Sequence, residues 1–457
     1  MPGEDVPAAR ADQPGGMEKT PRILIVGGGY VGMYAALRLQ RKLRRREASI
    51  TVVDPRSTMT YQPFLAEAAG GSIEPRHVVV PLRKVLDGCR VLTGAVTAVD
   101  TDRRLATVRS AEGDELQLGY DMLVLAAGSV SRTLPIPGLA EHAIGFGTVA
   151  EAVHLRNHVL SRLDLASSVD DAERRRAALT FTVVGGGYSG VEVLAELEDL
   201  ARYALRFHPA LTAADMRWVL VEASDRIMPE VSLPLASYTA ERLRRRGIEV
   251  KLGTRLESVV DGQVRLSDGE SFPAETVVWT AGVRGNPLAA RLGLPVDARG
   301  RLICTSDLHV YGVPGVWSAG DAAAVPDLSV DDPDATCGPS AQHAVRQAKR
   351  LADNIVAALR GERLRPYRHP YAGSVASLGL HKGVAEVYGI KLRGWPAWMM
   401  HRLYHLSRMP TFNRKARVAA DWVLAWLFRR EVVALEQLEH PRRDWERAAA
   451  DGFPDAA

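Results

Sequence analysis

Cysteine is scarce in this 457-residue sequence, and neither sign of charge predominates. The three cysteines, Cys89, Cys304 and Cys337, are far apart and form no CxxC pair. This excludes a zinc ribbon and a thioredoxin-like dithiol, so we interpret all three as ordinary structural thiols in a reducing, intracellular compartment. The formal net charge of +4 is too small to indicate a nucleic-acid partner.

Long apolar runs are also missing. No run approaches the roughly 18 residues that a membrane-spanning helix requires, so we expect a chain that is soluble or lies on a membrane surface. The first 20 residues likewise lack the apolar segment of a signal peptide or an anchor. We predict a disordered leader over residues 1–20.

Glycine is plentiful, and one glycine-rich pattern occurs twice. The first copy, Gly27-x-Gly29-x-x-Gly32, stands between the apolar run RILIV and the helical pattern YVGMYAALRLQRKLRRR. In such a unit the first glycine allows a tight turn, the second admits a pyrophosphate, and the third lets helix and strand pack closely. The next strand, SITVVD, ends at Asp54, where a carboxylate binds a ribose hydroxyl.

The second copy is Gly185-x-Gly187-x-x-Gly190, between the strand LTFTVV and the helix VEVLAELEDLARYAL. The next strand, RWVLVE, ends at Glu222, 32 residues after the last glycine, so we expect a longer helix or an extra loop. A single glycine pattern is weak evidence because a tight turn alone explains it. Each copy here has its strand, helix and acidic end, and together they predict two dinucleotide sites.

A third motif assigns the two sites. The stretch GVWSAGDAAAV, with Gly320 and Asp321, resembles the second flavin motif of flavoproteins that have two dinucleotide-binding domains. The resemblance implies that Asp321 holds the ribityl chain and that the first turn binds FAD. The same resemblance implies two crossovers between the domains. Ala127 and Gly128 mark the one on the FAD side, and Ala281 and Gly282 mark the one on the nicotinamide side. The second turn is left for a nicotinamide cofactor, and Glu222 favours NADH because a carboxylate repels a 2′-phosphate.

The electron acceptor is suggested by the helical stretch PSAQHAVRQAKRLADNI. Gln342 and Arg346 are four residues apart and share a face. The chain at this point resembles the type II NADH:quinone oxidoreductases, whose AQxAxQ helix lines the quinone site with two glutamines. The second glutamine position is Arg346 here, with Gln347 beside it. The resemblance implies a quinone site at these three residues; a surface helix with incidental polar residues is the alternative.

Two further residues enter through the same resemblance, which covers roughly residues 20–435. Glu192 matches a glutamate between the nicotinamide and the quinone, and Lys382 falls where the family often has a basic residue near the quinone. The alternatives are a first-turn helix carboxylate favoured by the helix dipole and a solvated hairpin lysine. The family's redox-active relatives with a CxxxxC pair are excluded, because this sequence has none.

The C-terminal stretch WPAWMMHRLYHLSRMPTFNRKARVAADWVLAWLFRR has four of the eight tryptophans, at near-helical spacing and mixed with arginine. This composition is typical of helices at a membrane interface. Packing on the core or on a second subunit is the alternative, so a homodimer is a further expectation.

The whole pattern predicts an α/β chain with two Rossmann-like domains, the second inserted in the first, followed by a hairpin and amphipathic helices. We expect an FAD domain (21–144 and 284–375), an NADH domain (145–283) and a C-terminal region for membrane association or dimerisation (376–457). The expected function is NADH oxidation with electron transfer through FAD to a quinone, without proton pumping, on the cytoplasmic face of the cell membrane. A soluble NAD(P)H diaphorase, a ferredoxin- or rubredoxin-type reductase, and a flavin-bound redox sensor or interaction protein are the alternatives. No metal site is expected.

Overall fold

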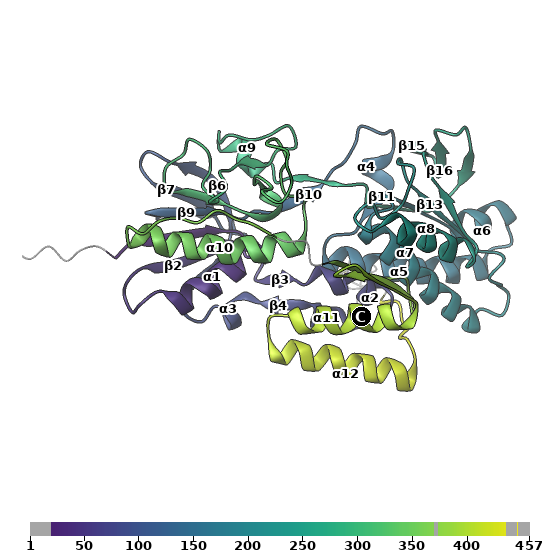
Figure 1. The fold of residues 1–457 in the computed structure, drawn as a ribbon. Coiled ribbons are helices and arrows are strands. Elements are labelled where there is room, and N and C mark those ends of the chain that lie inside the picture. Colours follow the sequence, from purple (N-terminus) through teal and green to yellow (C-terminus); the bar gives the residue numbers. More distant parts are fainter. Residues whose placement is uncertain (1–19, 370–372, 436–445, 447–457) are drawn as a thin grey trace, which may run out of the picture.

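The computed structural model describes residues 20–369, 373–435 and 446. The predicted leader lies outside the described residues except for Thr20, as does most of the chain after Leu435. The predicted α/β fold is confirmed: two five-stranded parallel sheets of Rossmann type stand side by side, and the C-terminal elements lie beneath them (Figure 1).

The first sheet combines strands from both ends of the chain. Its strands, in spatial order, are β21 (Val316–Ser318), β9 (Met122–Leu125), β1 (Arg22–Val26), β2 (Ser49–Asp54) and β5 (Arg90–Thr93). Apolar residues fill β1 because both faces of a parallel sheet are covered. Two helices, α1 (Tyr30–Lys42) and α10 (Ala341–Leu359), pack against each other along it (Figure 1).

The second sheet is built from the intervening part of the chain. Its order is β11 (Ala143–Gly145), β18 (Thr276–Trp279), β12 (Thr180–Val184), β13 (Arg217–Val221) and β14 (Ile248–Lys251). The helix α7 (Tyr188–Ala204) follows β12 and is four residues longer than α1, and a short 3₁₀ turn and a loop follow it before β13. These account for the long separation between the second glycine turn and Glu222.

Smaller elements complete both units. The helices are α2 (Leu65–Ala69), α3 (Leu82–Val85), α4 (Leu139–His142), α5 (Val149–Ser168), α6 (Ala172–Ala178), α8 (Leu233–Arg244) and α9 (Leu288–Arg291). The strands are β3 (Thr58–Thr60), β4 (Val79–Pro81), β6 (Ala95–Asp100), β7 (Leu105–Arg109), β8 (Glu115–Gly119), β10 (Ser129–Ser131), β15 (Leu256–Val260), β16 (Gln263–Leu266), β17 (Ser271–Pro273), β19 (Val283–Gly285), β20 (Leu302–Ile303) and β22 (Ala323–Ala324).

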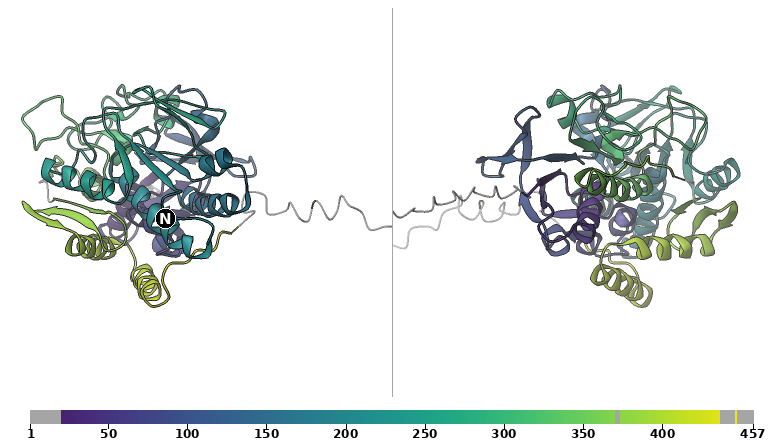
Figure 2. Two further views of the ribbon diagram at one scale, coloured as in Figure 1. Left: turned by 90° about the vertical axis from the view of Figure 1, so that its right-hand side faces the viewer. Right: turned by 60° about the vertical axis from the view of Figure 1, so that its left-hand side comes forward.

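The C-terminal region is a three-stranded antiparallel sheet followed by two helices. The strands are β23 (Gly373–Ser377), β24 (Gly383–Val387) and β25 (Ile390–Arg393), and the helices are α11 (Trp395–Arg408) and α12 (Phe412–Phe428). The helix α11 packs on the sheet, whereas α12 forms the lower margin of the molecule in every view (Figures 1 and 2). Only Val418 of α12 is buried, so most of this helix faces outward.

Candidate functional site

The first glycine turn has the geometry that its spacing predicts. Gly27 has φ +105°, a conformation that a side chain would strain, and a Cβ on Gly32 would lie 1.8 Å from the carbonyl oxygen of Gly27. Both glycines are therefore required by the fold itself. A Cβ on Gly29 would meet no atom within 4 Å, so the space in front of this residue is open.

The second turn repeats this geometry. Gly185 has φ +113°, a Cβ on Gly190 would lie 1.9 Å from the Gly185 oxygen, and a Cβ on Gly187 would meet nothing. The acidic residues also correspond: Asp54 accepts a hydrogen bond from the Gly28 amide at 2.7 Å, and Glu222 accepts one from the Gly186 amide at 2.6 Å. Each carboxylate thus lies beside its own glycine turn.

The amino ends of α1 and α7 are left without side-chain caps. Their N-cap residues are Gly29 and Gly187, and within the described residues neither helix has a side-chain cap hydrogen bond. By contrast, Thr148, Ser340 and Thr411 cap α5, α10 and α12. Uncapped first-turn amides with open space in front of them suit an anion such as a pyrophosphate. Both turns therefore fit a dinucleotide.

The third motif lies beside the first turn. Gly320 has φ +68°, and Asp321 accepts a hydrogen bond from the Ser129 hydroxyl at 2.9 Å. Burial raises the pKa of Asp321, although that hydrogen bond opposes the effect. Gln347 is also buried, and its Oε1 accepts a hydrogen bond from the Gly320 amide at 2.7 Å. Gln347 therefore fastens α10 to the Gly-Asp turn from inside the protein.

The two predicted crossovers lie next to each other. Gly128 and Gly282 both have positive φ, and a Cβ on either would meet nothing within 4 Å. They follow Ala127 and Ala281 and lead into β10 and β19, which pair as an antiparallel ribbon between the two units (Figure 1). The open sides of these glycines leave room for a ligand where the units meet.

The predicted acceptor residues on α10 face the chain that leads into β23. The Gln342 Nε2 donates to the Gly373 carbonyl oxygen at 3.1 Å, and the Arg346 guanidinium contacts the His369 ring. Gln347 points to the Gly-Asp turn instead, since neighbouring helix residues project in different directions. Of the three predicted residues, the structure brings Gln342 and Arg346 together and separates Gln347 from them.

Glu192 lies at the opposite end of β23. It is the fifth residue of α7, beyond a first turn that holds no acidic side chain, so the alternative of a first-turn carboxylate favoured by the helix dipole is wrong. Its Oε1 accepts a hydrogen bond from the Ser377 amide at 2.9 Å. The same oxygen is 3.2 Å from Nε2 of His401 on α11. The strand β23 therefore connects Gln342, at its first residue, with Glu192, at its last.

Lys382 lies beyond that strand, in the turn before β24. Its Nζ is 3.5 Å from Oδ1 of Asp199, two turns along α7 from Glu192. Lys382 is therefore paired with a carboxylate of α7, and the structure does not bring it together with Gln342 or Arg346.

Charged residues fasten the C-terminal region to the core, and two of them, Arg402 and Arg430, belong to the arginine-rich stretch that was expected at a membrane interface. The Arg402 guanidinium donates to Glu67 at 2.8 Å, and the Glu196 carboxylate is 2.8 Å from Arg430. All four side chains are buried. Trp422 of α12 adds a hydrogen bond to Glu67 at 2.9 Å. The sequence shows the charges of Arg402 and Arg430, but it does not show that their partners are carboxylates more than 200 residues earlier in the chain.

The three thiols have no sign of activation. Burial raises the pKa of Cys89 and Cys304 to about 12 and that of Cys337 to about 11. All three are free cysteines. A reactive thiolate requires the opposite shift, so the geometry offers no thiol chemistry at these positions.

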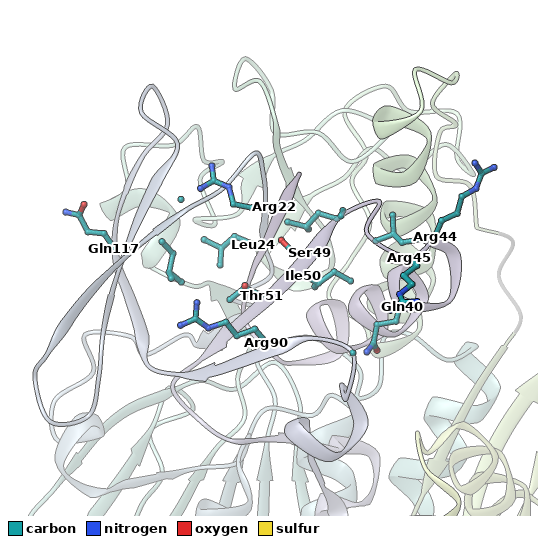
Figure 3. A pocket seen from close by; sticks show the side chains of 16 residues that line it. Arg22, Leu24, Gln40, Arg44, Arg45, Ser49, Ile50, Thr51, Arg90 and Gln117 are labelled. Carbon is teal, nitrogen blue, oxygen red and sulfur yellow. The ribbon is translucent and has the colours of Figure 1, made fainter. Parts of the chain in front are cut away.

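Figure 3 shows a surface cavity of about 720 Å³, whose lining includes no residue of either glycine turn. It opens at the amino ends of β1 and β2, next to Arg22 and Ser49, and Arg44, Arg45 and Arg90 also line it. Nucleotides bind at the carboxyl ends of such strands, so this cavity is not part of the dinucleotide site.

Within the described part of the chain, no helix is both long and apolar enough to cross a membrane. The same residues contain no cluster of three or more histidine, cysteine or acidic side chains arranged to hold a metal ion.

Comparison with known proteins shows which family this chain resembles. A model for the family described as pyridine nucleotide-disulphide oxidoreductase matches residues 21–348. The type II NADH:quinone oxidoreductase Ndh of Mycobacterium tuberculosis is 30% identical over 89% of this chain and 88% of its own length. The demethylphylloquinone reductase NdbB of Synechocystis is 31% identical over 88% of this chain and 96% of its own. A solved structure of NDH2 from Plasmodium falciparum in complex with NADH superposes with a TM-score of 0.84 at 18% identity, covering 91% of this chain and all of that one.

Proposed function

Because the chain belongs to the type II NADH:quinone oxidoreductases, we propose that it passes electrons to its quinone in the space beside β23, between Gln342 on α10 and Glu192 on α7. The chain is an FAD-dependent enzyme that oxidises NADH and reduces a quinone. The observation that carries the proposed position is that one short strand contacts both residues.

The first glycine turn would hold FAD. The uncapped amides of α1 face the pyrophosphate, Asp54 binds the adenosine ribose, and Asp321 binds the ribityl chain, with Ala127 and Gly128 at the crossover. When bound, the flavin supplies hydride acceptance and two-electron transfer. The chain's own contribution is to position it and to admit substrates from two directions.

The second turn would hold NADH in the same way. The amides of α7 face its pyrophosphate, Glu222 binds the adenosine ribose, and Ala281 and Gly282 border the crossover. Since Glu222 already accepts hydrogen bonds from Gly186 and Ser224, its carboxylate is fixed where a 2′-phosphate would lie. NADH is therefore preferred to NADPH.

At the acceptor site, Gln342 would donate to a quinone carbonyl, and Arg346 would stabilise the negative charge that develops on the quinol oxygen. Gln342 now contacts Gly373, the first residue of β23, and Arg346 contacts His369, which precedes the strand. If a bound quinone replaced these contacts, the Gln342 amide and the Arg346 guanidinium would each still have a hydrogen-bond acceptor. Gln347 supports the site indirectly through the Gly-Asp turn.

The test separates the two halves of the reaction in stopped flow. In Arg346→Gln, which restores the family residue, we expect slower quinone-driven recovery of the flavin absorbance and an unchanged rate of bleaching by NADH. Faster quinone reduction would mean that Arg346, paired with His369, closes the site against quinone.

We also propose that the outer face of α12 lies on the cytoplasmic surface of the cell membrane. Phe412 is 85% exposed, and Trp426 and Phe428 are each 77% exposed. Basic residues stand on the same helix or at its end: Arg414, Lys415, Arg417 and Arg429. Apolar and basic side chains together favour an interface with anionic lipid. A lipid-soluble quinone would enter from the same side.

Sedimentation with anionic vesicles tests this face. The double variant Trp426→Ser/Phe428→Ser should remain in the supernatant, whereas Phe207→Ser, which changes a 61% exposed aromatic residue in the second unit, should bind as the wild type does. If the wild type fails to bind vesicles but sediments as a dimer that the double variant loses, the face is a subunit interface.

A further inference from the structure

The partner of Glu192 differs in kind from the partners of the other carboxylates under the C-terminal region. Glu67 is paired with Arg402, and Glu196 with Arg430, while Asp199 contacts Lys382. These cations keep their charge throughout the physiological pH range. Glu192 is paired with His401, whose ring changes charge near neutral pH.

His401 is enclosed by charged and titratable groups from each element around it. Glu192 of α7 and Glu67 of α2 favour its protonated form, whereas Arg402 on its own helix opposes it. Burial alone lowers the pKa of His401, but the hydrogen bond and charge of Glu192, helped by Glu67, outweigh burial, so the pKa lies above its ordinary value. The neighbouring His405 ring is 4.6 Å away, edge-on, and burial keeps its own pKa well below the ordinary value.

The second ring nitrogen of His401 adds to this evidence. The side chain is 2% exposed, and its Nδ1 has no hydrogen-bond partner among the described residues. A group that served only to fasten two elements would use both of its donors, as buried polar groups generally do. Both contacts to Glu192 fall on Oε1, one from His401 and one from the Ser377 amide, so Oε2 is directed to neither.

We propose that His401 is a positioning residue: it holds a proton next to Glu192, and Glu192 passes that proton to the quinone. This inference rests on the proposed acceptor site. NADH supplies two electrons and one proton as a hydride, and the quinone takes up two electrons and two protons. One proton must therefore come from elsewhere. It passes from Nε2 of His401 to Glu192 and from Glu192 to the quinol oxygen; His401 becomes neutral and regains a proton from the solvent.

Steady-state turnover with two acceptors tests the proposal. A water-soluble quinone takes up protons, whereas ferricyanide takes up only electrons. In the wild type, kcat with quinone should fall as the pH rises through the raised pKa of His401, and kcat with ferricyanide should lack this limb. In His401→Gln we expect kcat with quinone to fall about 100-fold, the lower end of the range for loss of a positioned acid, with ferricyanide turnover within about twofold of wild type.

Two further variants separate proton supply from simple fastening. His401→Lys keeps a cation beside Glu192 but binds its proton too tightly, so quinone turnover should stay low near neutral pH. His77→Gln is the matched control, because His77 pairs with Asp421 of α12 at 2.6 Å and so fastens the C-terminal region without touching Glu192. It should leave both turnovers near the wild-type values.

A readout independent of turnover is the pH dependence of thermal unfolding. A group whose folded pKa is raised contributes stability that is complete below its unfolded pKa and is lost as the pH rises through its folded pKa. The difference in Tm between wild type and His401→Gln should therefore be largest in mild acid and shrink as the pH rises.

Several results would overturn the proposal: full quinone turnover in His401→Lys, equal loss of ferricyanide and quinone turnover in His401→Gln, or the same loss in His77→Gln. A Tm difference that does not vary with pH would also contradict it. These failures are distinct from failure of the acceptor site, which would appear as unchanged quinone reduction in variants of Gln342.

Discussion

Replacing Glu222 with glutamine removes one negative charge from the second glycine turn and preserves the shape of the side chain. The amide oxygen can still accept from Gly186, whose nitrogen is now 2.6 Å from Oε2, but the amide nitrogen that replaces Oε1 cannot accept from the Ser224 amide. The variant therefore removes the repulsion toward a 2′-phosphate together with one local hydrogen bond. Asp54→Asn loses the equivalent hydrogen bond from Arg56 and so serves as the control for that local change.

The magnitude follows from Coulomb's law. Two unit charges about 4 Å apart interact by about 1 kcal/mol in water and about 4 kcal/mol near a protein surface. We take the repulsion between Glu222 and a 2′-phosphate as about 1.4–2.8 kcal/mol, in the lower part of that range. Its loss should raise the ratio of kcat/KM for NADPH to kcat/KM for NADH about 10- to 100-fold.

The repeated architecture provides a matched control. Asp54 makes the same contact in the first turn, to Gly28 at 2.7 Å. Asp54→Asn should weaken FAD retention but leave the NADPH/NADH ratio of the flavin-loaded fraction unchanged. Steady-state kinetics with both cofactors measures the ratio. A wild type that uses both cofactors equally, or a ratio that moves in Asp54→Asn as much as in Glu222→Gln, would refute the reasoning.

Three other perturbations have defined outcomes. Gly32→Ala forces a Cβ to within 1.8 Å of a backbone oxygen and should lower Tm or soluble yield, whereas Gly29→Val, at an open position, should leave the apoprotein folded but poor in bound flavin, as absorbance would report. Arg402→Met leaves the buried Glu67 carboxylate without its counter-charge, with only the Trp422 hydrogen bond remaining, and should cost about 3 kcal/mol in denaturant unfolding. Glu67→Gln in the same chain should restore a substantial part of this loss. Burial lowers the pKa of His158 to about 4, so this side chain binds a proton more tightly in the unfolded chain than in the folded one. The free energy of unfolding should therefore decline by up to about 3 kcal/mol as the pH falls from about 6.5 toward 4. His158→Gln should remove this decline from the pH dependence of unfolding.

The parts of the molecule that depend on neighbouring residues could be predicted from the sequence. The glycine turns are local: Gly27 and Gly32 are fixed by contacts within a few residues or with the adjacent strand. The acidic strand ends follow from the length of one strand–helix–strand unit. These patterns were sufficient for the fold and for the family.

The C-terminal contacts could not be predicted in the same way. The pairing of Glu192 with His401 joins residues about 200 positions apart, and no local spacing determines it. The strand β25 was also missed, although the Tyr388-Gly389 pair, both with positive φ, is the signal of a two-residue hairpin turn. The direction of Gln347 depends on which face of α10 packs on the core, and the motif alone does not distinguish that residue from Arg346 as a candidate for the quinone site.

The most direct test of the account is the oxidation of the bound flavin by quinone in Gln342→Met, followed by stopped flow beside the half-reaction with NADH. The side chain keeps its size but loses the donor that now contacts Gly373 at 3.1 Å. The control is Arg360→Gln at the far end of the same helix, where a surface ion pair with Glu47 is lost. We predict that Gln342→Met slows the quinone step about 100-fold, the lower end of the range for loss of a positioned donor, and leaves bleaching by NADH unchanged. A quinone step as fast as in the wild type and in Arg360→Gln would contradict the account.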